Sequence, residues 1–310
     1  MSLGGIVITR HAGGRRLNID AWRYNDAMKD DRKYLPAPLL KELHTRALEF
    51  ADAGDAVILN AWKNGFTVEH KHDGSFVTNA DRDVEQTIRD RVAALYPNHG
   101  VLGEEFPPTN PHAEFQWILD PIDGTEDFVH RVPTFGSILS VYYRGAPIVG
   151  VLDHPALGLR CHAAFGRGTY KNYFVRRGDT AHRHDERVTL TDLPPDFAAA
   201  EVRLVTSARG NYIRYRDEGR SFDAVTCTYP NHRIYRSCYG HTLVATGAAD
   251  AMVDYHDSSW DLAACQITTE EAGGVFRVIR EFTVDGVTMR SVVFGKPRLV
   301  AALCELLGAT

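Results

Sequence analysis

The stretch WILDPIDGT, residues 117–125, places two carboxylates, a proline and a glycine-threonine step at the end of an apolar segment. Its apolar start predicts a short buried strand, and Pro121 disfavours helix at Asp120, so Asp120 is presented where the strand ends. Gly124 lets the backbone approach a ligand closely, and residues 126–129 predict a short helix whose free N–H groups suit an anion. The stretch therefore predicts carboxylates for a metal ion beside amides for a phosphate. It is also a good turn, because Asp, Pro and Gly all favour turns.

Two acidic residues upstream stand beside apolar elements in the same way. Asp81 follows Thr78 and Asn79, either of which can cap the amphipathic helix that begins there, so Asp81 lies in its first turn. Glu104 belongs to VLGEE, residues 101–105, in which an apolar pair ends in glycine and two acids. Each has a simpler interpretation, since an acid favours the positive end of a helix dipole and a charge often ends an edge strand.

A fourth acidic segment, SWDLAAC at residues 259–265, lies far downstream and contains Asp261. Asp261 precedes a predicted helix that runs to Glu271 and is closed by Gly273 and Gly274, and as an N-cap it would need no other role. Four acidic clusters at the ends of apolar elements form one pattern, which four separate structural roles explain poorly. The pattern favours a single site.

The order of these segments resembles the inositol monophosphatase superfamily of metal-dependent, lithium-sensitive phosphatases. The motifs that carry the resemblance are Val-Thr-x-x-Asp, Gly-Glu-Glu, Asp-Pro-Ile-Asp-Gly-Thr and Trp-Asp-Leu-Ala-Ala, followed by Glu-Ala-Gly-Gly, and they cover about residues 38–308. The resemblance implies a mixed α+β and α/β fold, the layered αβαβα sandwich of the inositol monophosphatase and fructose-bisphosphatase type. It also implies that the protein is a phosphoric monoester hydrolase.

The resemblance implies a role for each site residue. The metal ligands are Glu104, Asp120, the Ile122 carbonyl, Asp123 and Asp261, which would hold about two or three magnesium ions, with manganese as a substitute. The catalytic residues are Glu104, Thr125 and Asp81, with Thr125 orienting the attacking water and Asp81 as its partner. The amides of Gly124 and Thr125 would bind phosphate, and Asp254, seven residues before Asp261, would contact the leaving group.

The chemistry also follows from the residues themselves. A phosphomonoester dianion repels a nucleophile, so several acids around it make sense only where metal ions overcompensate their charge. Two magnesium ions, bridged by Asp120, could polarise the phosphoryl oxygens, acidify a bound water and stabilise the leaving oxygen. A phosphorylated aspartate is the weaker scheme, because proline and isoleucine separate Asp120 from Asp123 and the Asp-x-Asp spacing is absent.

The substrate class stays open. A small polyol or amino-alcohol phosphate, similar to inositol monophosphate, is the main hypothesis, and histidinol phosphate and a 3′-nucleotide or sugar bisphosphate are the enzymatic alternatives. A catalytically weak regulatory protein that keeps the metal site is a further one, although every expected metal ligand and Thr125 is present. Glu126 and Asp127 depart from the family pattern and add negative charge near the expected phosphate site. Asp254 is shorter than the glutamate of inositol-type members.

Composition narrows the class of protein. The net charge of −5 disfavours a general nucleic-acid binder. No apolar run approaches the ~20 residues that span a bilayer, and the first residues lack the basic start of a signal peptide. The five cysteines are odd in number and scattered, which favours reduced thiols. These features favour a cytoplasmic protein with neither nucleic acid nor membrane as partner. We further expect a homodimer, and the resemblance implies a small-molecule phosphomonoester as substrate.

The chain divides into an N-terminal extension at residues 1–35, an α+β metal- and phosphate-binding subdomain at 36–180, and an α/β subdomain at 181–310 that completes the active site. Helical spacing predicts a helix from residue 37 to 62, and alternation broken by turn signals predicts an antiparallel meander from 135 to 170. His241 and His256 lie near the distal carboxylates in sequence, and we interpret both as structural.

Overall fold

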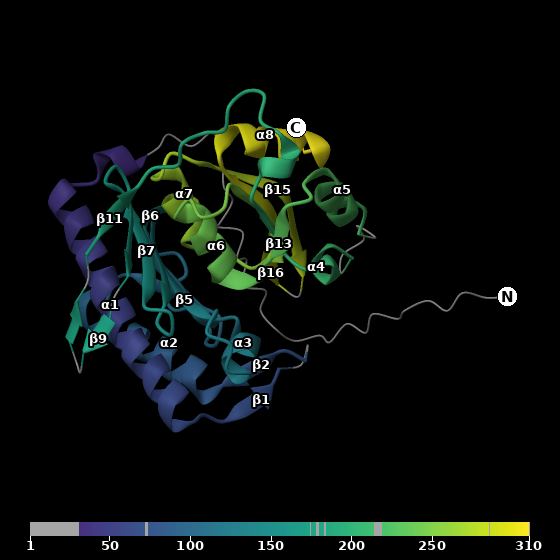
Figure 1. The fold of residues 1–310 in the computed structure, drawn as a ribbon. Helices are drawn as coiled ribbons and strands as arrows, with labels where there is room; N and C mark the ends of the chain where they lie inside the picture. The colour runs from purple at the N-terminus through teal and green to yellow at the C-terminus, as the bar shows by residue number, and fades with distance from the viewer. Residues whose placement is uncertain are drawn as a thin grey trace.

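The structure, a computed structural model, describes residues 31–71, 74–173, 175–177, 180–182, 184–213, 219–284 and 286–309. Most of the extension expected at residues 1–35 therefore lies outside the described residues. Two mixed β-sheets with helices around and between them form the molecule (Figure 1). In this part of the chain, no helix is both long enough and apolar enough to cross a membrane.

The first sheet has seven strands in the order β11-β8-β7-β6-β5-β4-β3. Their bounds are Gly100–Gly103 (β3), Phe115–Asp123 (β4), Gly136–Tyr143 (β5), Ala146–His154 (β6), Leu159–Ala164 (β7), Gly168–Tyr173 (β8) and Glu186–Val188 (β11). β3 is parallel to β4, and the other neighbours are antiparallel. Strands β5 to β8 confirm the expected meander. β11 carries the sheet past the boundary expected at residue 180.

Two long helices cover one face of this sheet. α1 (Ala37–Asn64) and α2 (Asn79–Leu95) confirm the two helices that the apolar spacing predicts. They pack against β4, β5 and β6 around the fully buried Trp117. Gly54 lowers the helix propensity of α1 but has a packing reason, since a Cβ there would lie 3.3 Å from Val84 Cγ1 of α2.

The second sheet has five strands in the order β13-β12-β14-β16-β15. Their bounds are Leu204–Thr206 (β12), His232–Ile234 (β13), Ala251–Asp257 (β14), Val275–Val284 (β15) and Val287–Gly295 (β16). β12 is parallel to both β13 and β14, whereas β16 is antiparallel to both β14 and β15.

Helices fill the space between the sheets and cover the outer face of the second one. α6 (Ser237–Ala245) contacts β5 and β14, and α7 (Cys265–Glu270) contacts β6 and β15. α8 (Pro297–Leu306) packs on β15 and β16 beside α5 (Arg220–Thr228). The succession of helices, sheet, helices, sheet and helices is the αβαβα sandwich that the sequence resemblance implies (Figure 1).

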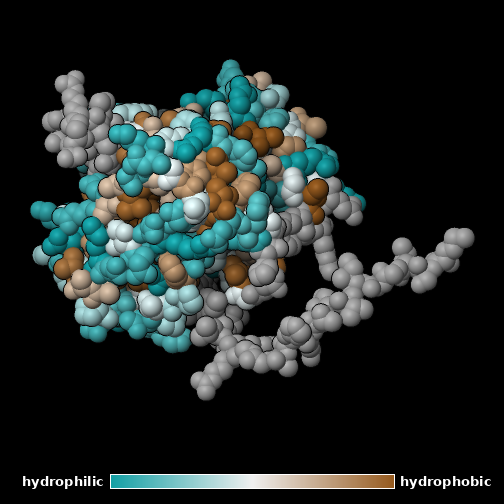
Figure 2. All heavy atoms as spheres, turned by 90° about the horizontal axis from the view of Figure 1, so that it is seen from below, coloured by the Kyte–Doolittle hydropathy of each residue, from teal (hydrophilic) through white to brown (hydrophobic). Residues whose placement is uncertain are grey.

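The remaining elements are short. They are the hairpin of β1 (Val68–His70) and β2 (Phe76–Thr78), the pair β9 (Val175–Arg177) and β10 (Thr180–His182), α3 (Thr125–Val129), α4 (Arg209–Ile213), and 3-10 helices at Asp31–Tyr34 and Ala199–Glu201. The face drawn in Figure 2 is mostly hydrophilic, and its hydrophobic residues lie in separate patches.

Candidate active site

The end of β4 brings Asp120 and Asp123 to one point. Asp120 pairs with Ile138 of β5 and Asp123 with Gly136, so two residues of β4 oppose a single residue of β5 and the strand bulges. Without the bulge, positions three apart would face opposite sides of the sheet. Pro121 suits this position, because proline has no N–H to give to a ladder.

Asp261 reaches the same point from the second sheet. One carboxylate oxygen each of Asp120, Asp123 and Asp261 lies within 4.8 Å of the others. Asp261 stands in turns at residues 259–264, so these turns separate it from α7, and the predicted helix does not follow it directly. The backbone N–H of Ser258 donates to Asp261 Oδ2 at 2.7 Å, and that of Cys238, in α6, donates to Asp123 Oδ2.

Burial and the repulsion between neighbouring negative charges disfavour the ionised forms of these carboxylates. Burial, and after it the charge of Glu104, raises the pKa of Asp120 well above its usual range. Burial and the charge of Asp261 raise the pKa of Asp123 to about 7, and burial raises the pKa of Glu104 to about 8 although Lys71 opposes it. A divalent cation would relieve this repulsion, and carboxylate oxygens are the ligands that magnesium prefers. The residues therefore fit a metal centre.

Glu104 follows β3, where α2 fixes the backbone. The Glu85 carboxylate accepts a hydrogen bond from the backbone N–H of Glu105 at 2.8 Å. Gly103 permits this approach, because a Cβ there would lie 2.3 Å from the Glu85 carboxylate. Lys71 Nζ lies 2.7 Å from one oxygen each of Glu104 and Glu105. The sequence interpretation missed Glu85 and Lys71, and the glycine before two acids was the available signal of a close approach.

Thr125 and Asp81 lie together, as the sequence resemblance implies. Thr125 Oγ1 is 3.3 Å from Asp81 Oδ1 and 3.0 Å from the Ile122 carbonyl oxygen. Thr78 caps α2, and its backbone N–H donates in return to Asp81 Oδ2 at 2.8 Å. Burial raises the pKa of Asp81 to about 6, against the lowering effect of these hydrogen bonds. Gly124 opens α3 with φ +82°, a conformation that other residues rarely adopt.

A cavity of about 330 Å³ collects residues from both sheets. From the first half of the chain it is lined by Gly74, Ser75, Phe76, Glu104, Asp123, Gly124, Thr125, Glu126 and Asp127. From the second half it is lined by Ser207, Asn211, Arg236, Ser237, His241, Asp254, Asp257 and Asp261. Asp81 and Asp120 are buried and do not line it. The structure thus brings together all the site residues expected from the sequence.

His241 belongs to the cavity wall, whereas the sequence suggested a structural histidine. Its Nε2 lies 2.9 Å from Asp254 Oδ2. Burial alone would lower the pKa of His241, but the hydrogen bond and charge of Asp254 raise it above its usual value. Asp254 therefore favours the protonated, cationic form of His241. The sequence interpretation did not single out Asp257, which lines the same wall.

Glu126 and Asp127, the two departures from the family pattern, have partners within the protein. Glu126 Oε2 lies 3.4 Å from Arg236 Nη1, and both side chains are exposed. The Thr134 hydroxyl donates to Asp127 Oδ2 at 2.6 Å. Glu126 thus has a cation nearby and Asp127 a hydrogen-bond donor within the protein.

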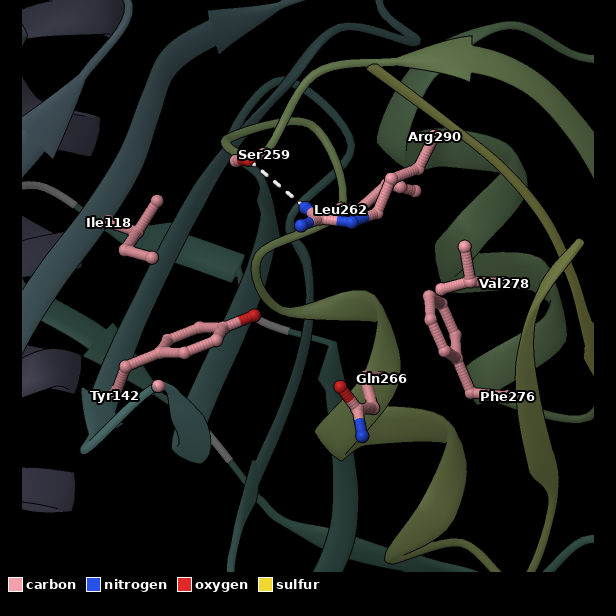
Figure 3. Close-up of a pocket in the computed structure, with 9 residues that line it drawn as sticks. Ile118, Tyr142, Ser259, Leu262, Gln266, Phe276, Val278 and Arg290 are labelled. Carbon is pink, nitrogen blue, oxygen red and sulfur yellow. Dashed lines mark hydrogen bonds between the residues drawn. The ribbon is translucent and has the colours of Figure 1, made fainter. Parts of the chain in front are cut away.

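A second cavity lies between β4 and β5 on one side and α7, β15 and β16 on the other (Figure 3). Arg290 Nη1 donates to Ser259 Oγ at 3.1 Å, and Tyr142 Oη donates to the Ala263 carbonyl at 3.0 Å. Its described lining residues include no carboxylate. The Arg290 contact helps to hold the turn that carries Asp261.

Comparisons with known proteins bear on the family and the fold of this chain. A model of the inositol monophosphatase family matches residues 39–307. The histidinol-phosphatase of Chlorobaculum parvum is 33% identical over 74% of this chain and 82% of its own. That of Mycobacterium tuberculosis is 37% identical over 71% of this chain and 78% of its own. The solved inositol monophosphatase of Zymomonas mobilis covers 88% of this chain and 100% of its own, with a TM-score of 0.71 and 23% identity, which supports the fold alone.

Proposed function

The chain belongs to the inositol monophosphatase family of phosphatases, and from that premise we propose that it is a magnesium-dependent phosphomonoesterase whose substrate is the phosphate ester of a small amino alcohol. Histidinol phosphate is the representative of that class. The observation that carries the proposal is the junction, in one cavity, of a carboxylate metal centre with a second acidic wall formed by Asp254 and Asp257.

The metal centre consists of carboxylates from both sheets. Asp120, Asp123 and Asp261 would hold magnesium, together with Glu104 and the Ile122 carbonyl, which the family pattern adds. The bound ion would supply positive charge to the phosphoryl oxygens and acidify a water. We propose that the amides of Gly124 and Thr125 hold the phosphate beside it, because Gly124 turns the backbone at the start of α3.

Thr125 and Asp81 are suited to orient the attacking water. The Thr125 hydroxyl has two acceptors within hydrogen-bond distance, Asp81 Oδ1 and the Ile122 carbonyl, so it can exchange one of them for water. Asp81, with a pKa of about 6, changes protonation state near neutral pH, as a residue that receives a proton should. Glu104 would hold the water from the other side.

The acidic wall favours a cationic leaving group over the alternatives. A sugar bisphosphate or a nucleotide bisphosphate needs positive charge for its second phosphate, but Arg236 is the one lysine or arginine among the described lining residues and is paired with Glu126. The two histidinol-phosphatase relatives support the same substrate class. Inositol 1-phosphate is the neutral-alcohol candidate.

A turnover panel tests the proposal. Histidinol phosphate, inositol 1-phosphate, adenosine 3′,5′-bisphosphate and fructose 1,6-bisphosphate are compared with magnesium by phosphate release. Histidinol phosphate should give the highest kcat/KM, and Asp123→Asn should remove its turnover. A higher kcat/KM for inositol 1-phosphate would refute the amino-alcohol class, and no turnover of any ester would favour a regulatory metal-binding protein.

A further inference from the structure

The end of β14 has a β-bulge like the one at the end of β4. Asp254 pairs with Val292 of β16 and Asp257 with Arg290, so residues 255 and 256 oppose Ser291 alone. In a regular strand, positions three apart would face opposite sides. The bulge instead brings both carboxylates into the lining of the cavity. The first sheet therefore contributes Asp123 of its Asp-x-x-Asp pair to the cavity lining, and the second sheet contributes both carboxylates of its pair.

The bulge is fixed from outside. His256 adopts φ +68°, a left-handed conformation that is rare for a residue with a side chain. Its Nδ1–H donates to the Asn211 carbonyl of α4. The Asn211 side chain donates in turn to the Tyr255 carbonyl at 3.4 Å. These contacts hold Asp257 in the cavity without using its own carboxylate.

Two buried polar atoms on this wall, Asp257 Oδ2 and His241 Nδ1, have no hydrogen-bond partner among the residues that the structure describes. The His241 side chain is only 1% exposed, and its other nitrogen is engaged by Asp254. An unsatisfied buried polar group destabilises the folded state, because it loses its hydrogen bonds to water without replacing them. Such atoms at the edge of a ligand cavity indicate that a ligand supplies the missing partner.

We propose that Asp257 determines specificity by accepting a hydrogen bond from the ammonium group of the leaving alcohol, an inference that rests on the proposed function. The charges on the wall single out this residue. Asp254 is hydrogen-bonded to His241, whose cationic form it favours, and Glu104 is balanced in part by Lys71. Among the described residues, no cation pairs with Asp257. The ammonium group would supply both the missing charge and the missing donor.

The protonation of Asp257 in the free protein agrees with this role. Burial, and after it the charges of Asp254 and Asp261, raises the pKa of Asp257 well above its usual range. An adjacent cation has the opposite effect and favours the carboxylate. A neutral leaving alcohol would instead bind the protonated Asp257 through a hydroxyl. Asp257 variants should therefore affect esters of cationic alcohols and esters of neutral alcohols differently.

The test compares histidinol phosphate with its deamino analogue, 3-(imidazol-4-yl)propyl phosphate, which lacks only the ammonium group. 4-Nitrophenyl phosphate, which has neither the ammonium group nor the imidazole, serves as the third substrate. Asp257→Asn removes the charge at constant size, Asp257→Glu keeps it, and Glu126→Gln removes one charge elsewhere on the same cavity. Circular dichroism and thermal unfolding check that each variant folds.

We expect Asp257→Asn to lower kcat/KM for histidinol phosphate by about tenfold or more, mainly through KM. The deamino analogue and 4-nitrophenyl phosphate should change by less than about twofold. Asp257→Glu should keep part of the preference, and Glu126→Gln should keep all of it. Equal losses for all three esters, or no loss for any, would refute the inference. If Asp257→Asn does not fold, the same comparison is made with Asp257→Ser.

A binding measurement separates this inference from the proposed function. Histidinol, the product alcohol, is tested as an inhibitor of 4-nitrophenyl phosphate hydrolysis, and its Ki should rise about tenfold in Asp257→Asn. If the wild type cleaves histidinol phosphate but Asp257→Asn keeps the wild-type preference among the three esters, only the inference about Asp257 fails. If the wild type neither cleaves the ester nor is inhibited by the alcohol, both fail.

Discussion

Raising the pH should destabilise the metal-free protein, and Asp120→Asn should suppress much of that effect. Glu104 has an ordinary pKa of 4.5 and a folded-state pKa of about 8. The folded state therefore binds a proton that the unfolded chain has released, so the associated stability is present at low pH and is lost as the pH rises towards 8. Asp120 shifts in the same direction.

The size of this loss of stability with rising pH follows from proton linkage. Each group that is protonated only in the folded state lowers the free energy of unfolding by about 1.4 kcal/mol per pH unit. Between about pH 6.5 and 8, Glu104 alone accounts for about 2 kcal/mol, and Asp120 contributes in the same direction. Burial lowers the pKa of His44 to about 4, so this histidine opposes the trend near pH 6.5, where the unfolded chain still binds part of its proton, and no longer does so near pH 8. Asp120→Asn deletes one of the linked protons and should therefore make the slope shallower.

The assay is thermal and urea unfolding of chelator-treated protein across this pH range. Asp196→Asn, which alters an exposed carboxylate, is the matched control and should follow the wild type. Magnesium should restore wild-type stability at about pH 8, because it stabilises the ionised carboxylates. A melting temperature that rises with pH in the metal-free wild type, or equal slopes for Asp120→Asn and Asp196→Asn, would refute the electrostatic account of the site.

Three further predictions concern turnover. Asp120→Asn should remove most activity at saturating magnesium while circular dichroism shows an intact fold; near wild-type turnover would rule out the two-metal scheme. Calcium should bind, as calorimetry would detect, but support little hydrolysis because its bonds to oxygen are longer and its geometry looser; equal rates with magnesium and calcium would contradict this. Asp254→Ala should lower kcat/KM for the true substrate by about 1–3 kcal/mol and that for an aryl phosphate much less; equal losses would assign Asp254 to the metal or folding network.

Local patterns were enough to predict several of the elements that surround the candidate site. Apolar spacing predicted α1 and α2, and the Thr78 cap places Asp81 in the first turn of α2 as expected. Turn residues between apolar runs predicted the meander. The proximity of Asp120, Asp123 and Asp261 was expected from the motif order, because a shared site explains acids at the ends of separate apolar elements.

Long-range contacts could not be predicted in this way. Glu85 supports the backbone after Glu104 from a helix, and its sequence position gives no sign of that contact. Asp257 reaches the cavity only because His256 adopts a left-handed conformation, which sequence does not indicate for histidine. The pairing of His241 with Asp254 depends on how α6 packs beside β14.

The two Asp-x-x-Asp bulges stand on different sheets, and this separation bears on how the protein can change through evolution. The pair on β4 belongs to the proposed metal centre, whereas the pair on β14 belongs to the wall that we assign to the leaving alcohol. A mutation at Asp257 would therefore alter which ester is accepted while the β4 bulge that carries Asp120 and Asp123 stays in place. Selection for a new substrate would act mainly on the second sheet, while Asp261, in the turns that follow β14, would stay constrained by the proposed metal centre.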